Sequence, residues 1–284
     1  MATTIRKQQT EYCDSEYDRL NKVIVCQPRY MKIEEVINET QKHFLDKNID
    51  IETALIQHGN FVKAMKENGA EVIQLPPDQR LPEQVFTRDI GFTIGDTVYV
   101  SEMGSDIRSG EVSVLTDWLE SNGLQYEKLD FSSIEGGDVI IDKDKIFVGI
   151  SHRTDQGTIN QLQELAEGYQ VIPVPFQKKY LHLDCVFNIL SPDEALVFSP
   201  AFKRKELKML ESYYDLIEVN AEEQFTMGTN VLSIGNRKVL SLPQNKGVNR
   251  SLRSYGYEVI EVDFSEIIKS GGSFRCCSMP LLRD

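Results

Sequence analysis

Short runs of alternating hydrophobic and polar residues occur in pairs along the chain, and turn-forming residues separate the two runs of each pair. In residues 91–102, for example, two such runs flank Gly95-Asp96. This arrangement is typical of a β-hairpin. It returns at 138–151, 186–199 and 230–243. We therefore predict four hairpins spaced roughly 45–50 residues apart, which is within the range of repeat architectures.

A helical pattern follows each hairpin, with apolar residues recurring every three or four positions. Three of these helices are expected to end at a glycine, namely Gly123, Gly168 and Gly256. A short strand follows each helix: "YEKLDF", "QVIPVPF", "LIEVN" or "YEVIEVDF". The predicted helical faces carry Val112, Leu115, Trp118 and Leu119; Ile159, Leu162 and Ala166; Leu207, Leu210 and Tyr214; and Val248, Leu252 and Tyr255.

A fifth unit is predicted from the two ends of the chain. A helical pattern over 55–65 stops at Gly69 and leads into the strand "EVIQLP". Its hairpin is split between "KVIVCQP" near the N-terminus and "SFRCCSMPLL" near the C-terminus. Five units joined in this way form a closed ring. We predict a single α/β domain over residues 1–284, with helices outside and strands inside.

The charge and the composition exclude several classes of partner. The formal net charge of −13 argues against nucleic acid, whose binding requires a basic face. No stretch approaches the ~20 consecutive apolar residues of a transmembrane helix. The first twenty residues contain no apolar signal-peptide core. We expect a cytoplasmic protein that does not bind membranes.

Five cysteines are present, and their spacing predicts neither disulfides nor a metal site. The number is odd, and no CxxC pair occurs. The spacings of cysteine and histidine do not suit zinc, so no metal is expected. Cys13, Cys26 and Cys185 are interpreted as small buried apolar residues. The pair Cys276-Cys277 follows two glycines in "GGSFRCCSMP", which could be a buried strand or a strand that carries a nucleophile.

Chemically useful side chains follow the short strand of four units. In chain order these side chains are Asp89 in one unit, Glu135 and Asp138 in the next, His182 and Asp184 in the third, and Cys276 in the last. In the remaining unit the strand is followed by "TMGTN". Taken singly, each has an ordinary role, since an aspartate after a strand is usually a turn or cap residue. In a ring of equivalent units, however, these positions converge on one axis. Their recurrence favours a shared site.

The residue types of this site suit a planar cation. Several carboxylates around one axis repel one another unless a cation lies between them. A guanidinium group offers five N–H donors in a fixed fork that carboxylates accept. A thiolate could attack the guanidinium carbon, and a histidine could protonate the leaving amine and then activate water.

As a set and in this order, "FTRD", "EGGD", "SHRT", "HLD" and "GGSFRC" resemble the guanidine-modifying branch of the pentein superfamily. That branch includes arginine deiminases, dimethylarginine dimethylaminohydrolases and amidinotransferases. The resemblance extends from "EYDRLNKVIVCQP" to the last residues. It implies a five-bladed α/β propeller of ββαβ units around a pseudo-fivefold axis, which agrees with the five predicted units.

The resemblance also implies a role for each residue of the site. Cys276 matches the nucleophile, and Cys277, on the opposite face of the expected strand, is interpreted as a packing residue. His182 matches the acid and base, and Glu135 the acid that orients it. The predicted substrate-binding residues are Asp89 and Asp184 for the guanidinium group, Arg153 and Arg108 for an α-carboxylate, and Asp138 without a separate role. Both arginines could instead form surface ion pairs.

The implied reaction is hydrolysis of a guanidino group through a covalent S-alkylthiouronium intermediate, which releases a ureido product such as citrulline. No cofactor is expected, the partner is a small guanidino compound, and a homodimer is left open. An amidinotransferase using the same intermediate is the alternative. A non-catalytic pentein that binds ribosomal subunits is disfavoured, because such proteins lack the Cys, His and acid set.

The motifs point to different subfamilies. The overall length resembles dimethylarginine dimethylaminohydrolases, whereas "FTRD" and "HLD" resemble deiminases, since the typical "HLK" of the former is absent. If His182 and Asp184 share one face of a strand, Asp184 would require an N–H donor that a dimethylated nitrogen lacks. We therefore predict a preference for an unsubstituted guanidinium.

Overall fold

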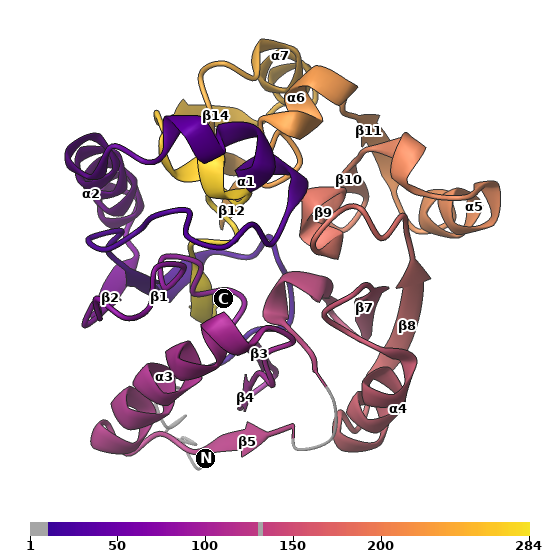
Figure 1. The fold of residues 1–284 in the computed structure, drawn as a ribbon. Coiled ribbons are helices and arrows are strands. Elements are labelled where there is room, and N and C mark those ends of the chain that lie inside the picture. Colours follow the sequence, from indigo (N-terminus) through magenta and orange to yellow (C-terminus); the bar gives the residue numbers. More distant parts are fainter. Residues whose placement is uncertain (1–10, 130–132) are drawn as a thin grey trace, which may run out of the picture.

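The computed structural model describes residues 11–129 and 133–284, and Figure 1 shows their strands gathered in five groups around the middle of the molecule. Each group is a sheet of three strands. In each sheet the middle strand pairs antiparallel with one neighbour and parallel with the other. The sheets comprise β15 (Met279–Arg283), β1 (Leu20–Cys26) and β2 (Glu71–Leu75); β3 (Gly91–Ile94), β4 (Thr97–Val100) and β5 (Tyr126–Lys128); β6 (Val139–Asp142), β7 (Lys145–Ile150) and β8 (Gln170–Pro175); β9 (Phe187–Ile189), β10 (Glu194–Val197) and β11 (Asp215–Glu218); and β12 (Leu232–Gly235), β13 (Lys238–Ser241) and β14 (Glu258–Glu261).

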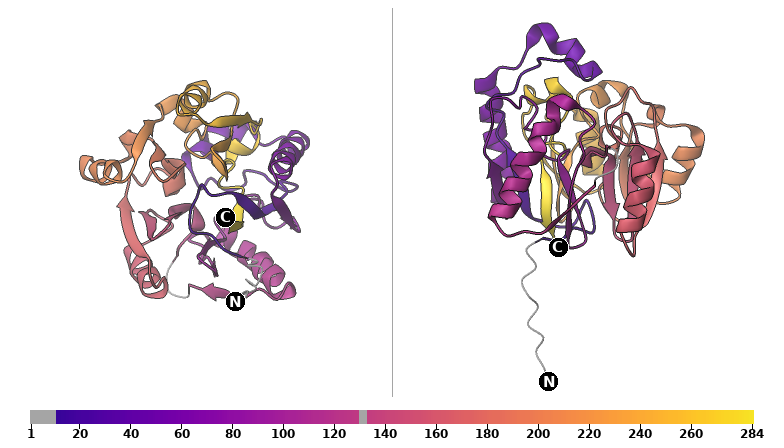
Figure 2. Two further views of the ribbon diagram at one scale, coloured as in Figure 1. Left: turned by 180° about the vertical axis from the view of Figure 1, so that it is seen from behind. Right: turned by 60° about the horizontal axis from the view of Figure 1, so that its bottom comes forward.

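The longer helices lie on the outside of the ring (Figures 1 and 2). The α-helices are α1 (Glu39–Phe44), α2 (Ile51–Glu67), α3 (Ser109–Ser121), α4 (Gln156–Leu165), α5 (Arg204–Glu211), α6 (Ala221–Phe225) and α7 (Lys246–Ser254). The 3-10 helices are η1 (Leu45–Lys47), η2 (Asp106–Arg108), η3 (Gly136–Asp138), η4 (Leu183–Cys185), η5 (Ser199–Ala201) and η6 (Ile267–Ser270). Within residues 11–129 and 133–284, no helix has the length and apolar character needed to span a membrane.

Local sequence accounts for where these helices begin and end. The side chains of Asp50 and Asp155 accept hydrogen bonds from backbone N–H groups in the first turns of α2 and α4, as expected of N-cap residues. Beyond the C-terminal ends of α3 and α7, Gly123 and Gly256 adopt left-handed backbone angles, with φ of +69° and +83°. Glycine reaches this conformation without the steric penalty of a Cβ atom.

The two ends of the chain meet in one sheet, as the split hairpin predicts. Strand β1 pairs antiparallel with β15, so that Val23 lies opposite Pro280, and parallel with β2. The prediction that Cys276 and Cys277 lie on a strand is wrong. Residues 274–277 form a turn, and β15 begins only at Met279. Because the turn is buried, its apolar composition resembles that of a strand.

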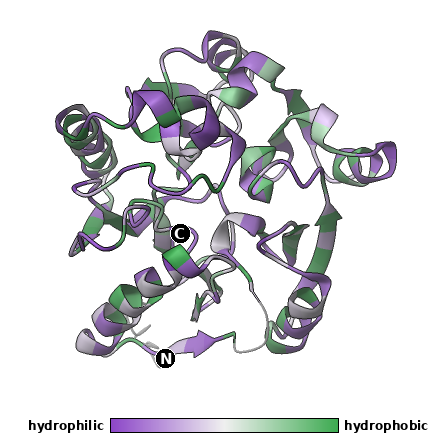
Figure 3. Ribbon diagram, in the orientation of Figure 1, coloured by the Kyte–Doolittle hydropathy of each residue, from purple (hydrophilic) through white to green (hydrophobic). Residues whose placement is uncertain are grey.

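The apolar core is divided into five clusters. In the cluster next to α2, for example, the rings of Phe264 and Phe274 stack with centroids 4.6 Å apart, and Phe61 packs against both. Figure 3 shows hydrophobic residues along the strands and on one side of the helices, whereas the segments that connect them are largely hydrophilic. This distribution leaves polar groups at the middle of the ring.

A carboxylate surrounded by arginines lies buried among the connecting segments. Glu16 Oε1 accepts hydrogen bonds from Arg88 Nη2 at 2.7 Å and from Arg275 Nη2 at 3.1 Å. Burial alone would raise the pKa of Glu16, but Arg275, Arg88 and Arg283 outweigh it and lower the pKa to about 2. Glu16, Arg88 and Arg275 are each at most 4% exposed. The group is therefore a buried, ionised network that joins the N-terminal segment to residues 88 and 275.

The first prediction concerns this network. Glu16→Gln leaves the buried Arg88 without its counter-charge and leaves Arg275 with Asp184 alone, so we expect the free energy of unfolding to fall by about 3–5 kcal/mol. The folded-state pKa of Glu16 lies below its ordinary value of 4.5. The difference between wild type and variant should therefore be full above pH 4.5 and should shrink as the pH falls towards 2. Urea titrations across this pH range measure it.

Glu261→Gln is the matched control for this experiment. Glu261 pairs with Arg253 at 2.7 Å, but its side chain is 36% exposed. An exposed pair of this kind contributes about 1 kcal/mol or less. An equally small effect of Glu16→Gln would contradict a structural role for the buried network.

Candidate active site

A narrow pocket lies beside the buried arginine network. It is lined by Ile37, Asn38, Glu83, Phe86, Asp89, Arg108, Leu181, His182, Ser270, Gly271, Gly272 and Cys276. Four of the residues predicted from sequence thus line one pocket: Asp89, Arg108, His182 and Cys276. The other four are buried beside it: Glu135 contacts His182, Asp184 contacts Cys276, Asp138 contacts the backbone next to His182, and Arg153 contacts Glu135.

His182 and Glu135 form a buried ion pair. The Nε2 atom of His182 lies 2.7 Å from Glu135 Oε2, and both side chains are fully buried. Burial lowers the pKa of His182, but Asp89 and Glu135 outweigh it and raise the pKa to about 10. Burial likewise opposes ionisation of Glu135, yet the hydrogen bond from His182 lowers its pKa to about 2. At neutral pH the pair is therefore imidazolium and carboxylate.

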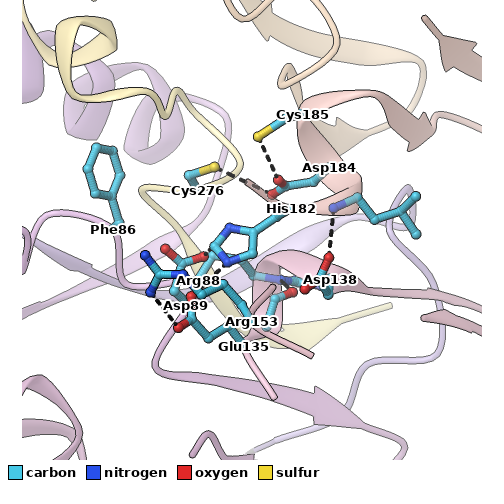
Figure 4. A network of polar contacts seen from close by, with 12 residues as sticks. Phe86, Arg88, Asp89, Glu135, Asp138, Arg153, His182, Asp184, Cys185 and Cys276 are labelled. Carbon is cyan, nitrogen blue, oxygen red and sulfur yellow. Dashed lines mark hydrogen bonds and ion pairs between the residues drawn. The ribbon is translucent and has the colours of Figure 1, made fainter. Parts of the chain in front are cut away.

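Asp89 presents one free acceptor atom to the pocket. Its Oδ2 atom accepts a hydrogen bond from Arg108 Nη1 at 2.6 Å, whereas Oδ1 has no hydrogen-bond partner among the described residues. His182 Nδ1 also lacks a hydrogen bond, and the two atoms are 3.5 Å apart. Figure 4 shows the imidazole between Asp89 and the segment that carries Cys276. Buried polar atoms without partners are costly, and in a pocket they indicate where a polar ligand binds.

Cys276 is held in place by backbone and side-chain contacts. Its carbonyl oxygen accepts a hydrogen bond from the backbone N–H of Arg88, and its own N–H donates to Asn230 Oδ1. The thiol lies 3.5 Å from Asp184 Oδ2. A hydrogen bond with Cys185, burial and the charge of Asp184 raise the pKa of Cys276 well above its ordinary value. The resting group is therefore a thiol rather than a thiolate.

Sequence reasoning missed Asn230, which contacts the candidate nucleophile directly. Asn230 Nδ2 lies 3.1 Å from Cys276 Sγ and 3.3 Å from the carbonyl oxygen of Asp184. A donor at this position stabilises a thiolate once it forms. Asn230 ends the tract "TMGTN", the one unit for which no candidate was chosen. Its position in the repeat could have identified it, although its uncharged side chain gave no chemical signal.

Arg108 and Arg153 are not surface ion pairs. Arg108 is 1% exposed and donates to Glu111 as well as to Asp89. Arg153 is buried, and its Nη1 atom lies 3.0 Å from Glu135 Oε1. Both guanidinium groups thus contact carboxylates of the protein, and their predicted contact with a substrate carboxylate stays a prediction.

Asp138 and Asp184 have protein partners on both carboxylate oxygens. Asp138 accepts hydrogen bonds from Ser151 Oγ at 2.6 Å and from the backbone N–H of Leu183 at 2.9 Å, and burial raises its pKa to about 7. Asp184 Oδ2 accepts from Arg275 Nη1 at 2.7 Å. The premise that His182 and Asp184 share a strand is wrong, because residues 183–185 form η4. Asp184 therefore does not need a substrate donor to be satisfied.

The paired glycines allow close packing around the site, as the sequence predicts. A Cβ atom on Gly137 would lie 2.6 Å from His182 Nδ1 and 2.8 Å from Asp89 Oδ1. A Cβ atom on Gly272 would lie 2.5 Å from the ring of Phe86 and 3.1 Å from Cys276 Cβ. Larger residues at these positions would displace the candidate catalytic groups.

Asp89, Glu135 and His182 could also surround a cation. Each offers one donor atom, and these atoms lie within 4.8 Å of one another. Two carboxylates and an imidazole can bind a divalent metal, and they can equally accept hydrogen bonds from a guanidinium group. The expected absence of a metal cofactor stays a prediction.

Glu83 is a second pocket residue that sequence reasoning missed. Its carboxylate accepts hydrogen bonds from Gln41 of α1 and from Ser270 of η6, and burial raises its pKa to about 7. These contacts hold α1 beside the pocket, and Asn38, at the start of α1, also lines it. A larger pocket of about 580 Å³ adjoins this end and shares Asn38, Leu181 and Gly271 with the narrow one.

Three curated proteins are similar to this chain in sequence, and their names describe different functions or none. The chain is 54% identical to the uncharacterized protein YkgA of Bacillus subtilis, covering 98% of this chain and 97% of that protein. It is 26% identical to the N(G),N(G)-dimethylarginine dimethylaminohydrolase of Mycobacterium tuberculosis, covering 82% and 77%. It is 30% identical to the arginine deiminase of Streptococcus gordonii over 72% of this chain, but spans only 61% of that enzyme.

Solved structures share the fold at low sequence identity. The N-terminal domain of ArgZ, an arginine dihydrolase from Cyanobacteria, superposes with a TM-score of 0.85 at 22% identity, covering 94% of this chain and 98% of that one. SxtG, an amidinotransferase from Microseira wollei, gives a TM-score of 0.84 at 18% identity, covering 96% and 97%. The family model described as N,N dimethylarginine dimethylhydrolase, eukaryotic, matches residues 27–283. The chain therefore belongs to the dimethylarginine dimethylhydrolase family, in the guanidine-modifying branch of the pentein superfamily.

Proposed function

We propose that the protein is a cysteine-dependent hydrolase of the guanidino group of arginine or an arginine derivative. In this proposal residues 1–284 act as one domain, and the five sheets are the blades of a pentein propeller. The five free thiols are compatible with a reducing compartment such as the cytoplasm. Relatives named for hydrolysis at guanidino groups support the reaction class.

One observation carries the proposal. The pocket that holds Cys276 is also lined by Asp89 and His182, whose Oδ1 and Nδ1 atoms have no hydrogen-bond partner among the described residues. A guanidinium group in this pocket donates an N–H to Asp89 Oδ1 and presents its carbon to the thiol. Acceptor, proton donor and nucleophile then surround one carbon atom, an arrangement that holds the reactants in position.

The first half-reaction forms the thiouronium. The positive charge of the bound guanidinium lowers the pKa of the Cys276 thiol, which loses its proton to solvent. The thiolate attacks the guanidinium carbon, and a C–S bond forms. The imidazolium of His182 then protonates the leaving nitrogen, and the C–N bond breaks to release ammonia or an amine. Glu135 stabilises the imidazolium before this transfer.

The second half-reaction returns the enzyme to its resting form. His182 is now neutral and takes a proton from water as the oxygen attacks the thiouronium carbon. The tetrahedral intermediate collapses, the C–S bond breaks, its hydroxyl group loses a proton to solvent, and the ureido product is released. The departing thiolate accepts a hydrogen bond from Asn230 Nδ2, which lies 3.1 Å from Cys276 Sγ. It then regains a proton from solvent.

An amidinotransferase is the second candidate function, and the larger pocket is the observation that supports it. That pocket adjoins the narrow one at Asn38, Leu181 and Gly271 and has room for an amine acceptor. The acceptor nitrogen would replace water in the second half-reaction. Measuring ammonia and ureido product with and without candidate amines separates the two reactions, because an acceptor-dependent turnover without ureido product belongs to the transferase.

The second prediction distinguishes the adjacent cysteines. Cys276→Ser should abolish turnover of arginine, because the hydroxyl is a much weaker nucleophile than a thiolate. Cys277→Ser, the matched control, should keep most of the activity, because Cys277 does not line the pocket. Ammonia release by both variants measures the difference in turnover. Adding a chelator to the same assay tests whether turnover depends on a metal. Activity in the first variant and loss in the second would assign the nucleophile to Cys277.

The third prediction separates the two half-reactions. His182→Ala should form the covalent thiouronium slowly and fail to hydrolyse it, because no base remains to activate water. Intact-mass measurement after mixing with arginine should show an adduct on this variant. His152→Ala, an exposed histidine outside the pocket, is the control and should turn over normally. A folded His182→Ala variant that binds arginine without any adduct contradicts the two-step role.

The fourth prediction concerns methylation of the substrate. Asp89 Oδ1 lacks a donor, and a guanidinium nitrogen bearing two methyl groups has none to offer. Leaving this buried acceptor unpaired costs about 1–3 kcal/mol, so kcat/KM for arginine should exceed that for asymmetrically dimethylated arginine by roughly tenfold to hundredfold. Steady-state kinetics of both compounds on one preparation measure the ratio. A clear preference for dimethylarginine would contradict this prediction and would assign the pocket to the dimethylarginine dimethylaminohydrolase subfamily.

A further inference from the structure

A second thiol lies beside the candidate nucleophile. Cys185, at the end of η4, lies 3.7 Å from Asp184 Oδ1, and Cys276 lies 3.5 Å from Oδ2 of the same carboxylate. Figure 4 shows both sulfur atoms directed at Asp184 from different segments. The sequence pattern favoured a packing role for Cys185. Packing alone does not require this contact with the carboxylate that Cys276 also contacts.

We propose that Cys185 is a resolving cysteine, which forms a reversible disulfide with Cys276 when a peroxide oxidises the site. Both cysteines are free and 3% exposed, and they belong to segments far apart in the chain. A hydrogen bond from the Cys276 thiol to Cys185 contributes to the raised pKa of Cys276, which is consistent with contact between the two thiols. Forming the disulfide requires the two sulfur atoms to approach to the S–S bond length of about 2.05 Å.

The surrounding contacts hold the two segments together. Asn230 Nδ2 bridges the carbonyl oxygen of Asp184 and the sulfur of Cys276. The carbonyl oxygen of Cys185 accepts hydrogen bonds from Thr229 Oγ1 at 2.6 Å and from Gln224 Nε2 at 3.2 Å. These residues fix the relative position of the thiols, so forming the disulfide orders little additional chain.

Both cysteines border pockets, and these pockets adjoin each other. Cys276 lines the narrow pocket, and Cys185 lines the larger pocket that adjoins it. Cys277 lines neither pocket and packs in the apolar cluster around Phe61 and Phe274. The geometry therefore selects Cys185, rather than the neighbour in sequence, as the partner of Cys276.

The chemistry needs one peroxide and no other reactant. The Cys276 thiol attacks a peroxide oxygen, the O–O bond breaks, and the products are a sulfenic acid and water or an alcohol. The Cys185 thiol then attacks this sulfur, the S–O bond breaks, and a second water leaves with the thiol proton. Two electrons pass from the two thiols to the peroxide. A thiol reductant reverses the step, whereas a sulfenic acid without a partner oxidises further to an irreversible sulfinic acid.

The fifth prediction tests this pair by mass rather than by activity alone. The whole protein is treated with hydrogen peroxide, blocked with N-ethylmaleimide, digested and mapped. Wild type should lose two hydrogens and yield a linked peptide containing Cys185 and Cys276, and dithiothreitol should restore its starting activity. Cys185→Ser should instead gain two oxygen atoms at Cys276 and should not recover. Each variant is normalised to its own untreated activity.

Cys277→Ser is the control and should behave like wild type in linkage and in recovery. A sulfinic acid at Cys276 of wild type without any Cys185 link overturns the proposal, as does a link between Cys276 and Cys277. The activity readout rests on the proposed function, but the peptide map does not. If no guanidino compound is turned over, the proposed function fails. The linked peptide still shows whether Cys185 and Cys276 form a disulfide.

Discussion

The carboxylate of Glu16 is the contact on which the geometry of the site depends. It binds Arg88 and Arg275, and these two residues directly precede Asp89 and Cys276 in the chain. A single buried acceptor therefore fixes two backbone segments whose next residues supply the candidate guanidinium acceptor and the candidate nucleophile. Arg88 Nη2 and Arg275 Nη2 also both donate to the carbonyl oxygen of Val139, close to Glu135 in the chain. Three loops are thus oriented by one network whose residues Glu16, Arg88 and Arg275 do not line the narrow pocket.

Pairing with the protein's own arginines determines which carboxylate oxygens remain available. Glu135 contacts Arg153, Asp184 contacts Arg275, and Asp89 contacts Arg108, so much of the negative charge around the pocket is neutralised internally. The exception is Asp89 Oδ1, which faces His182 without a donor. A cavity with many acidic residues can therefore recognise its cation through very few atoms. Counting acidic residues in the sequence would overestimate the number of ligand contacts.

The repeat could be predicted because its signals are local. Turn residues between alternating runs fix each hairpin, and glycine marks helix ends such as that of α3. The short helix α1 was missed, because "ETQKHF" has no apolar periodicity. The turn at Phe274 to Cys277 was mistaken for a strand, because its burial requires apolar residues in either conformation. The residue types of the site could be found from their positions in the repeat.

The partners of those residues could not be predicted, because they depend on packing between distant segments. No local pattern shows that Arg275 will bind Asp184, 91 residues earlier in the chain, or that Asn230 will contact Cys276. The prediction that Cys185 is buried is confirmed, but burial alone does not indicate which polar group a thiol contacts. Sequence periodicity thus locates the candidate site, and long-range contacts decide the chemistry within it.

The pairing of β1 with β15 has a consequence for how the protein is made. β15 follows every other described strand in the chain, and its partner is the first of them. During translation, β1 must wait for β15 to leave the ribosome before the ring can close, while the other sheets are built from strands nearer in sequence. Cys276 emerges only just before this closing strand. The nascent chain therefore cannot assemble a reactive site early, and the nucleophile and the closed ring become available only after β15 has been synthesised.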